Sequence, residues 1–416
     1  MQPSVMLKVW TKEFLGTVAR LDPKFVALHC QEVGGKNYER SMKHVEHFVR
    51  LLMASEELRL FDKVRVYLDE DFSSVEKFTA LGNFYFIHES VNDILIWDFQ
   101  ASNFVPVLGK EFHSGNIEDV PTKEKAKFPQ EFFPELKWSR KGFLRTRWSL
   151  NGTVYDLVNI HLFHDASNFV AMESFPSVYS KNRRRALEYT LERFQNDKYE
   201  SVPFFLFGDF NFRTDTQGVV KVVLSLGKKE FRHSNHQDVF VGADSQWLKG
   251  FDLELEPFKA SIFEFPVSFP PSYPFEEEQN AKEDGTNGGT NDVEAGAGTR
   301  YMHTRCPSWC DRVLMSPIAK SIICQASDDY PLEYGVIGKN ACMGDHKPVF
   351  LRFRMLMGAG VPAFRSGSKG PYITIDAKKS CPVNSSRGDI VSNTITRYIH
   401  IKHSDSPVRI FKETTV

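Results

Sequence analysis

The sequence predicts an α/β protein in which sheets stack on one another and are flanked by helices. Short apolar runs rich in aromatic and β-branched residues recur along the chain, as strands do. The Asn151-Gly152 pair between two such runs is a strong hairpin signal, so these two strands pair antiparallel. Helical patterns lie between the strands, notably at Tyr38 to Leu60 and Arg183 to Phe194. Antiparallel pairing with interspersed helices favours stacked sheets over a doubly wound parallel sheet.

The expected strands share an apolar run that ends in, or begins after, polar residues. In chain order they are FVALHCQE (25–32), FLRTRWSL (143–150), VYDLVNIHL (154–162), FFLFGDF (204–210), DRVLMS (311–316) and KPVFLRFRM (347–355). These runs place one domain at residues 1–357. A polar, glycine-rich stretch near 276–299 predicts a flexible loop inside this domain. Residues 358–416, with few aromatic side chains, are expected to form a weakly ordered C-terminal tail.

Composition narrows the class of protein. The chain has 416 residues, of which 41% are hydrophobic and 25% charged, so it can bury a large core. The formal net charge of −1 provides no global positive field to attract nucleic acid or an anionic membrane. The first residues, MQPSVMLKVWTKEF, lack the apolar core of a signal peptide, and no run is long enough to cross a bilayer. We therefore expect a cytosolic protein without a transmembrane segment.

The six cysteines are dispersed, unlike those of a disulfide-rich secreted domain, and are expected to be reduced thiols. Cys306 and Cys310 could form half of a zinc site. No second Cys/His pair follows at a suitable spacing, so buried structural cysteines are the better interpretation.

The segment FFLFGDFNFR, residues 204–213, places an acid and an amide at the end of an apolar run, and these are candidates for a functional site. Its apolar part is typical of a strand that is covered on both faces. If the chain stays extended beyond Gly208, the side chains of Asp209 and Asn211 point in the same direction. The alternative is a turn in which Asp and Asn hydrogen-bond their own backbone.

Polar residues of a similar kind lie at the ends of the other strands. Gln31-Glu32 follow the first strand, Asn159 and His161 end the third, and Asp311-Arg312 and Asp345-His346 begin the last two. Acids, amides and histidines without a thiolate pair favour hard oxygen coordination, and therefore Mg²⁺ over zinc. Mg²⁺ prefers one or two carboxylates together with substrate phosphate. Phosphate monoester hydrolysis is slow enough that metal, base and several cationic contacts must act together.

Two of these stretches resemble the inositol polyphosphate 5-phosphatase family. FLFGDFNFR (205–213) resembles the motif W-x-G-D-x-N-[FY]-R, and CPSWCDRVLM (306–315) resembles P-[AS]-W-C-D-R-[IV]-L. VNIHL, WSRKGF and GDHKPVF extend the similarity to about Phe25 to Phe353. HCQEVGGKNYE, FPSVYS and SFPPSYP are similar to the type I (A-type) members, which act on soluble inositol phosphates. The resemblance implies the endonuclease/exonuclease/phosphatase fold, a four-layer α/β sandwich of two mixed sheets flanked by helices.

The resemblance also implies a role for each motif residue. Glu32 would hold Mg²⁺, Asp209 would orient or deprotonate the attacking water, and Asn211 would position it. His346 would contact the scissile phosphate, with Asp311 fixing its tautomer and favouring its charged form, although an Asp–His pair can also be purely structural. His161 would hydrogen-bond the same phosphate, with Asn159 nearby.

Further basic and hydroxyl residues are candidates for contacts with substrate phosphates, because a polyphosphate ring carries several dianionic groups. They are Lys141, Arg312, Arg305, Tyr301 and Lys347. Lys141 and Arg312 lie in motifs, whereas the others could be solvated surface residues. The implied reaction is removal of the 5-phosphate from inositol 1,4,5-trisphosphate and inositol 1,3,4,5-tetrakisphosphate, which ends a calcium-release signal.

The chain departs from the family pattern at both ends. Members begin with a strand of the form T-x-N, which we expect to be missing here, leaving an exposed sheet edge or a hole. The type I enzyme ends in a prenylated C-a-a-X box, whereas this chain ends in FKETTV, so membrane association is not expected. The terminal Thr-Thr-Val matches a ligand of PDZ domains. Two alternatives stay open: an inositol-phosphate-binding protein without turnover, and a nuclease on the same fold.

Overall fold

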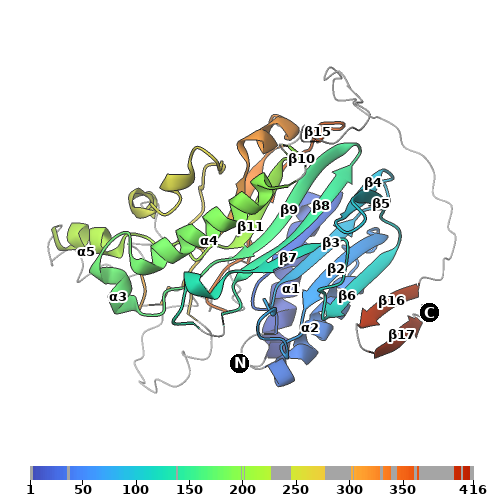
Figure 1. Cartoon of the computed structure of the whole chain (residues 1–416), viewed down its shortest axis with the longest axis horizontal. Coiled ribbons are helices and arrows are strands. Elements are labelled where there is room, and N and C mark those ends of the chain that lie inside the picture. The colour runs from blue at the N-terminus through green and yellow to red at the C-terminus, as the bar shows by residue number, and fades with distance from the viewer. Residues whose placement is uncertain are drawn as a thin grey trace, which may run out of the picture.

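Two large sheets form the centre of the molecule (Figure 1). The computed structural model describes residues 3–34, 38–136, 139–197, 199–200, 202–225, 245–276, 301–302, 304–327, 331–338, 344–359, 363–364, 398–403 and 406–412. The predicted loop at 276–299, apart from Glu276, and the terminal Thr-Thr-Val therefore lie outside the described residues.

The first sheet contains six strands in the order β1-β3-β2-β6-β16-β17. Their bounds are β1 Phe25–Cys30, β2 Lys63–Asp69, β3 Gly82–Ile87, β6 Lys110–Gly115, β16 Tyr398–His403 and β17 Ser406–Lys412. β1 and β2 both pair antiparallel with β3, while β6 runs parallel to β2. The C-terminal residues contribute β16 and β17, which extend this sheet beyond β6.

The second sheet contains seven strands, six of them in the order β12-β11-β9-β8-β4-β5, with β7 paired to β8. Their bounds are β4 Ile94–Asp98, β5 Asn103–Pro106, β7 Glu124–Lys127, β8 Gly142–Leu150, β9 Thr153–His161, β11 Phe204–Asp209 and β12 Asp311–Met315. The predicted hairpin is confirmed: β8 and β9 are antiparallel, and both Asn151 and Gly152 take positive φ values of 48° and 72°. β9 and β11 run parallel, so the sheet is mixed.

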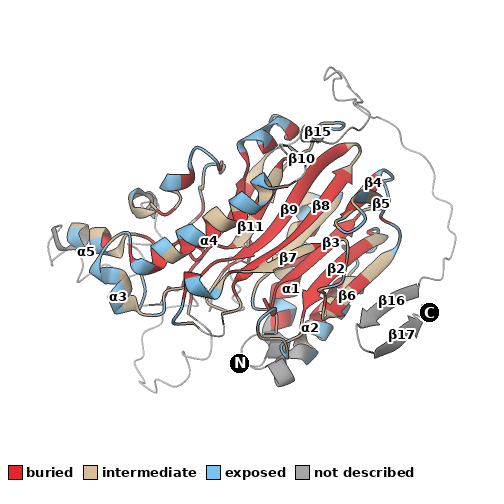
Figure 2. Cartoon of the chain, in the orientation of Figure 1, coloured by how far each residue is buried: buried red, intermediate tan, exposed pale blue. Residues whose placement is uncertain are grey.

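Helices cover the outer face of each sheet. They are α1 Pro3–Leu21 and α2 Tyr38–Met53 on the first sheet, and α4 Val178–Gln195 on the second. Leu7 and Trp10 of α1 pack with Phe48 of α2 against Val66 and Phe86. Figure 2 shows how burial concentrates along the central strands.

The two sheets pack face to face through a shared apolar core. Tyr85 and Ile87 of the first sheet contact a cluster that includes Leu144, Trp148 and Phe205 of the second. Successive residues of β3 alternate between this inner core and the helix-covered face, as pleated strands require. Helices, sheet, sheet and helix form four layers, so the predicted α/β sandwich is confirmed. No helix in the described part of the chain combines the length and the apolar content needed to cross a membrane.

The remaining elements are short and lie around the two sheets. They are α3 Asn168–Glu173, α5 Thr216–Ser225, the paired strands β10 Tyr199–Glu200 with β15 Ala363–Phe364 and β13 Glu333–Val336 with β14 Val349–Arg352, and 3-10 turns at Gln130–Phe132, Ser245–Phe251, Glu256–Phe258 and Pro317–Ile322. Among the described residues, Cys30, Cys306, Cys310 and Cys324 are not joined in disulfides.

β1 lies at the edge of its sheet: among the described residues it pairs only with β3. All six of its residues are half-buried, although FVALHC is apolar on both faces. A cavity of about 1120 Å³ adjoins this strand, is lined also by residues of α1 and β14, and extends to Glu32 and His346. The absence of a first strand stays a prediction.

Candidate active site

Strand register brings the predicted site residues of the second sheet into one row. β11 lies between β9 and β12, and Asp209 is opposite His161 on one side and Asp311 on the other. His161 in turn faces Gly142, which is next to Lys141. All of these residues lie where β9 and β11 end and β8 and β12 begin. Side chains distant in sequence therefore meet at one end of these four neighbouring strands.

Asp209 and Asn211 share one pocket, but not because the strand stays extended. β11 ends at Asp209, and Asn211 has a positive φ of 52°, a left-handed conformation that is uncommon outside glycine. The Asn211 backbone N–H donates to Asp209 Oδ1 at 2.8 Å, and Asn211 Nδ2 donates to Asp209 Oδ2 at 2.9 Å. The expectation of an extended chain was wrong. The turn alternative describes the backbone, and this turn itself brings the amide to the carboxylate.

Asp209 is held by basic groups as well as by Asn211. His161 Nε2 lies 3.2 Å from Asp209 Oδ2, and Lys141 Nζ is in hydrogen-bonding contact with the same imidazole nitrogen. Burial alone would raise the pKa of Asp209, but the charge of His346, the hydrogen bond from His161 and the charge of Lys141 outweigh it. The pKa of Asp209 therefore lies well below its usual range, and the residue is a carboxylate at neutral pH.

Burial acts in the opposite direction on the basic partners of Asp209. It lowers the pKa of Lys141 to about 8, with a partial offset from Glu32 and Asp209. Burial and the Lys141 charge also lower the pKa of His161, which is therefore neutral at neutral pH.

Asp311 and His346 form a hydrogen-bonded pair on the other side of Asp209. His346 Nδ1 lies 2.9 Å from Asp311 Oδ2, which also accepts from Ser272 Oγ at 2.7 Å. Burial would lower the pKa of His346, but the carboxylates of Asp311 and Asp209 outweigh this and raise it to about 9. The imidazole is therefore charged at neutral pH.

Glu32 is the second residue after β1 and faces the same site from the first sheet. Its φ of 54° is left-handed, and such strained backbone often occurs at functional positions. The side chain is 45% exposed, and its Oε1 lies 3.5 Å from Arg140 and 3.7 Å from Lys141. Burial raises the pKa of Glu32, but the charges of Lys141, His161 and Arg140 lower it below its usual value. Glu32 therefore provides an ionised carboxylate at the opening.

The donor set suits a hard divalent cation. Ligand atoms of Asp209, Asp311 and His346 lie within 4.8 Å of one another, and two of these residues offer carboxylate oxygens. Glu32, the residue predicted to hold the metal, is not in this group of three but carries a further half-exposed carboxylate beside it.

Of the six predicted substrate-binding residues, two lie at the site and four are engaged in hydrogen bonds or ion pairs within the fold. Lys141 lies within the site, and the exposed Arg305 reaches its rim, where Nη1 donates to the Tyr273 hydroxyl. The other four are buried, and each bonds to the protein. Asn159 bonds Gln31 and Asn83, Tyr301 donates to Pro271 O, Lys347 donates to Gly338 O, and Arg312 pairs with Asp252 and Glu264.

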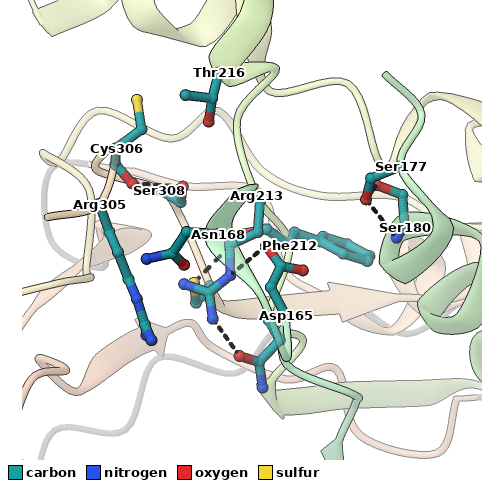
Figure 3. A network of polar contacts seen from close by, with 12 residues as sticks. Asp165, Asn168, Ser177, Ser180, Phe212, Arg213, Thr216, Arg305, Cys306 and Ser308 are labelled. Carbon is teal, nitrogen blue, oxygen red and sulfur yellow. Dashed lines mark hydrogen bonds and ion pairs between the residues drawn. The ribbon is translucent and has the colours of Figure 1, made fainter. Parts of the chain in front are cut away.

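Three residues at the site were not singled out from the sequence. Arg140 contacts Glu32, and His164 is a half-buried histidine whose pKa burial and then Lys141 lower to about 4. Arg213 donates a hydrogen bond to Asn211, and Figure 3 shows Arg213 among neighbouring polar side chains. Arg140 lies inside WSRKGF and Arg213 ends FLFGDFNFR, so both belong to quoted motifs, whereas His164 lies two positions beyond VNIHL.

Comparisons with known proteins identify a family and close relatives of this chain. Residues 99–352 match the family model described as Endonuclease/Exonuclease/phosphatase family 2. The chain is 47% identical over 393 residues to inositol polyphosphate-5-phosphatase A of Homo sapiens, with 86% of this chain and 91% of the human protein covered. It is 30% identical over 411 residues to a Caenorhabditis elegans protein described as "Probable type I inositol 1,4,5-trisphosphate 5-phosphatase", with 83% and 94% covered.

Proposed function

The chain belongs to the inositol polyphosphate 5-phosphatase family, a family of phosphate monoester hydrolases, and from that premise we propose its substrates and mechanism. With Mg²⁺ as cofactor, it removes the 5-phosphate from soluble inositol 1,4,5-trisphosphate and inositol 1,3,4,5-tetrakisphosphate. In the cytoplasm, this reaction ends a calcium-release signal. The observation that carries the proposal is the row of His161, Asp209 and Asp311 on three neighbouring strands, with the charged His346 beside it.

In this mechanism Asp209 orients the attacking water. Its low pKa makes it a weak base but a permanent hydrogen-bond acceptor, which suits orientation more than proton removal. Phosphoryl transfer passes through a loose transition state that requires little help from a base, so alignment supplies much of the effect. Asn211 holds the carboxylate in place through its backbone and side-chain N–H groups.

Positive charge stabilises the phosphoryl oxygens in the transition state. The His346 imidazolium, held by Asp311, donates to one oxygen, and the Lys141 ammonium lies across the site near His161. These groups are fixed before substrate arrives, so they require no reorganisation during the reaction. The Nε2 of the neutral His161 contacts Lys141 Nζ and lies 3.2 Å from Asp209 Oδ2, so this imidazole holds the carboxylate beside the reacting phosphate. Arg140 and Arg305 at the rim meet the other phosphates of the ring.

Glu32 would hold Mg²⁺, together with carboxylate oxygens of the neighbouring group of Asp209, Asp311 and His346. The hard oxygen donors, and the open position of Glu32, fit that ion better than zinc. When bound, Mg²⁺ supplies neutralisation of charge on phosphate oxygens.

The test measures phosphate release from inositol 1,4,5-trisphosphate with Mg²⁺ and identifies the product by ion-exchange chromatography. We expect stoichiometric phosphate together with inositol 1,4-bisphosphate. Inositol 1,4-bisphosphate supplied as substrate is the matched control and should release none, because it lacks the 5-phosphate. Binding of the trisphosphate without phosphate release would overturn the enzymatic proposal, and nicking of plasmid DNA at physiological salt would favour a nuclease.

Asp209→Ala tests the proposed role of Asp209 in orienting the attacking water, in the same phosphate-release assay. Removing the carboxylate should lower kcat by about 10²–10⁴-fold, since water would no longer be oriented. The melting temperature of the variant is measured in parallel to establish that it is folded. Turnover at the wild-type rate would contradict the assignment of Asp209.

A further inference from the structure

We propose that Arg213 is a positioning residue for this reaction, which acts by fixing the side-chain amide of Asn211 and, through it, Asp209. The inference rests on the proposed catalytic roles of Asp209 and Asn211. It concerns a residue that contacts neither the reacting phosphate nor the attacking water in the mechanism above.

The hydrogen bonds of Asn211 depend on which way its amide faces. Arg213 Nη2 donates to Asn211 Oδ1 at 2.6 Å, which leaves Nδ2 to donate to Asp209 Oδ2 at 2.9 Å and to Leu162 O at 3.0 Å. If the amide were rotated by half a turn, its oxygen would face the Asp209 carboxylate and its NH₂ would face the guanidinium. Both contacts would be repulsive. Arg213 therefore selects the orientation in which Asn211 supports the carboxylate.

Arg213 is itself held on several sides. Its backbone N–H donates to Glu254 Oε1 at 3.2 Å, and its Nε lies 4.0 Å from Asp165 Oδ2. The guanidinium carbon sits 4.1 Å from the centre of the Tyr273 ring, a cation–π contact. The buried Arg183 of α4 holds both acids, with its Nη1 2.6 Å from Asp165 and its Nε 2.7 Å from Glu254. Figure 3 shows Arg213 beside Asp165.

The surroundings of Arg213 argue for positioning rather than for contact with substrate. Its side chain is only 13% exposed, and the Tyr273 ring covers one face of the guanidinium. Nε and Nη1 are buried and have no hydrogen-bond partner within the described part of the chain, so the side chain's hydrogen bonding is directed to Asn211. Tyr273 also lies 4.5 Å, between ring centres, from His346. The Tyr273 ring therefore contacts both Arg213 and His346.

The experiment is a double-mutant cycle on kcat and KM. Arg213→Met is made in the wild type and in Asn211→Ala, and phosphate release from inositol 1,4,5-trisphosphate is measured for all four proteins. In the wild type, the substitution should lower kcat about 10- to 100-fold, as loss of a residue that orients an active-site group does, with KM unchanged. In Asn211→Ala it should cause no further loss, because the amide that Arg213 holds is already gone.

Two further variants separate positioning from general damage. Arg213→Lys keeps the charge and can donate one hydrogen bond to Asn211, so it should recover part of the lost kcat. Arg147→Met removes another buried arginine that bonds Asp156 and does not contact Asn211. It should lower the melting temperature at least as much as Arg213→Met does, while leaving kcat of the folded protein at the wild-type value.

The outcomes distinguish this inference from the proposed function. Full turnover by Asn211→Ala would refute the catalytic role of Asn211 and with it the premise. If Asn211→Ala is slow but Arg213→Met lowers kcat by the same factor in both backgrounds, the positioning role is refuted while the proposed function stands. A rise in KM with unchanged kcat would identify Arg213 as a substrate contact and overturn the inference.

Discussion

At the scale of single residues, the site sets its two central histidines in opposite protonation states. His346 faces Asp311 and Asp209, which raise its pKa to about 9, whereas burial and Lys141 lower the pKa of His161. The neighbouring groups, and not the imidazole itself, decide the protonation state of each histidine. The result is one charged and one neutral donor on either side of Asp209, an arrangement typical of sites that divide acid and base roles.

The pH dependence of kcat/KM should report the charge of His346. The raised pKa means that the imidazolium is present below about pH 9 and is lost as pH rises through that value. Asp311→Asn removes the carboxylate that raises this pKa, so the alkaline limb of the profile should move to lower pH. Lys141, with a pKa of about 8, contributes to the same limb in both proteins, so the shift between them is the quantity to compare.

Asp345→Asn is the control, since Asp345 Oδ1 lies 4.0 Å from His346 Nε2 and not in a hydrogen bond. Its alkaline limb should move less than that of Asp311→Asn. An alkaline limb that stays in place in Asp311→Asn would contradict the proposed pairing.

At the scale of elements, the close approach of β11 to β9 aligns the site. Gly208 makes this possible: a Cβ built there would lie 2.1 Å from Ile160 O and 3.0 Å from Gln31 Nε2. The contact with Ile160 is to backbone, which cannot move aside as a flexible side chain does. Without Gly208, β11 could not keep the register that sets Asp209 opposite His161.

Gly208→Ala should therefore lower both stability and turnover. We expect the free energy of unfolding in urea to fall by about 3 kcal/mol, at the upper end of the cost of overpacking. Gly250→Ala is the matched control, because a Cβ there meets nothing within 4 Å, and it should change stability by less than about 0.5 kcal/mol. Equal effects of the two substitutions would contradict the close-approach argument.

A buried ion network between β8 and β9 attaches the residues after α4 to the second sheet. Arg145 and Arg147 of β8 both bond Asp156 of β9 and Asp197, which follows α4. Asp156 is only 2% exposed, so water cannot reach the two arginines to solvate their charges in its place. Such networks add little net stability as a whole but are costly to break.

Asp156→Asn should destabilise the fold strongly, because it leaves two buried arginines with less compensating charge. The expected loss is about 3–5 kcal/mol in the free energy of unfolding, measured by urea titration. Glu188→Gln removes an exposed partner of Arg184 on α4 and should cost at most about 0.5 kcal/mol. A small loss in Asp156→Asn would show that the network is not the attachment we describe.

At the scale of the whole molecule, the site joins the two sheets. Glu32 comes from the end of β1 in the first sheet, whereas His161, Asp209 and Asp311 come from the second. The sheets are held together by the inner core around Tyr85 and Trp148, and the site lies where their strand ends meet. A ligand that bridges Glu32 and Asp209 therefore stabilises the packing of one sheet on the other.

Mg²⁺ with inositol 1,4-bisphosphate, a product that is not turned over further, should raise the melting temperature. A ligand at 100 times its Kd adds about 2.7 kcal/mol to the free energy of unfolding. Glu32→Gln should lose the part of this shift that depends on Mg²⁺, whereas Glu188→Gln on the distant surface of α4 should retain it. An undiminished Mg²⁺-dependent shift in Glu32→Gln would refute Glu32 as the metal-holding residue.

The sequence by itself determined six of the strands, the order of the motifs and the acids and histidines that meet at Asp209, but it did not identify the strands between residues 63 and 127. These features are legible because a strand's period and its end residues are local properties. Only the tertiary structure decided how each side chain is used. Asn159 and Arg312 lie in motifs yet bond to the protein, and Arg213 was not identified as part of the site. A side chain's burial and partners depend on register between strands far apart in sequence, which no local pattern encodes.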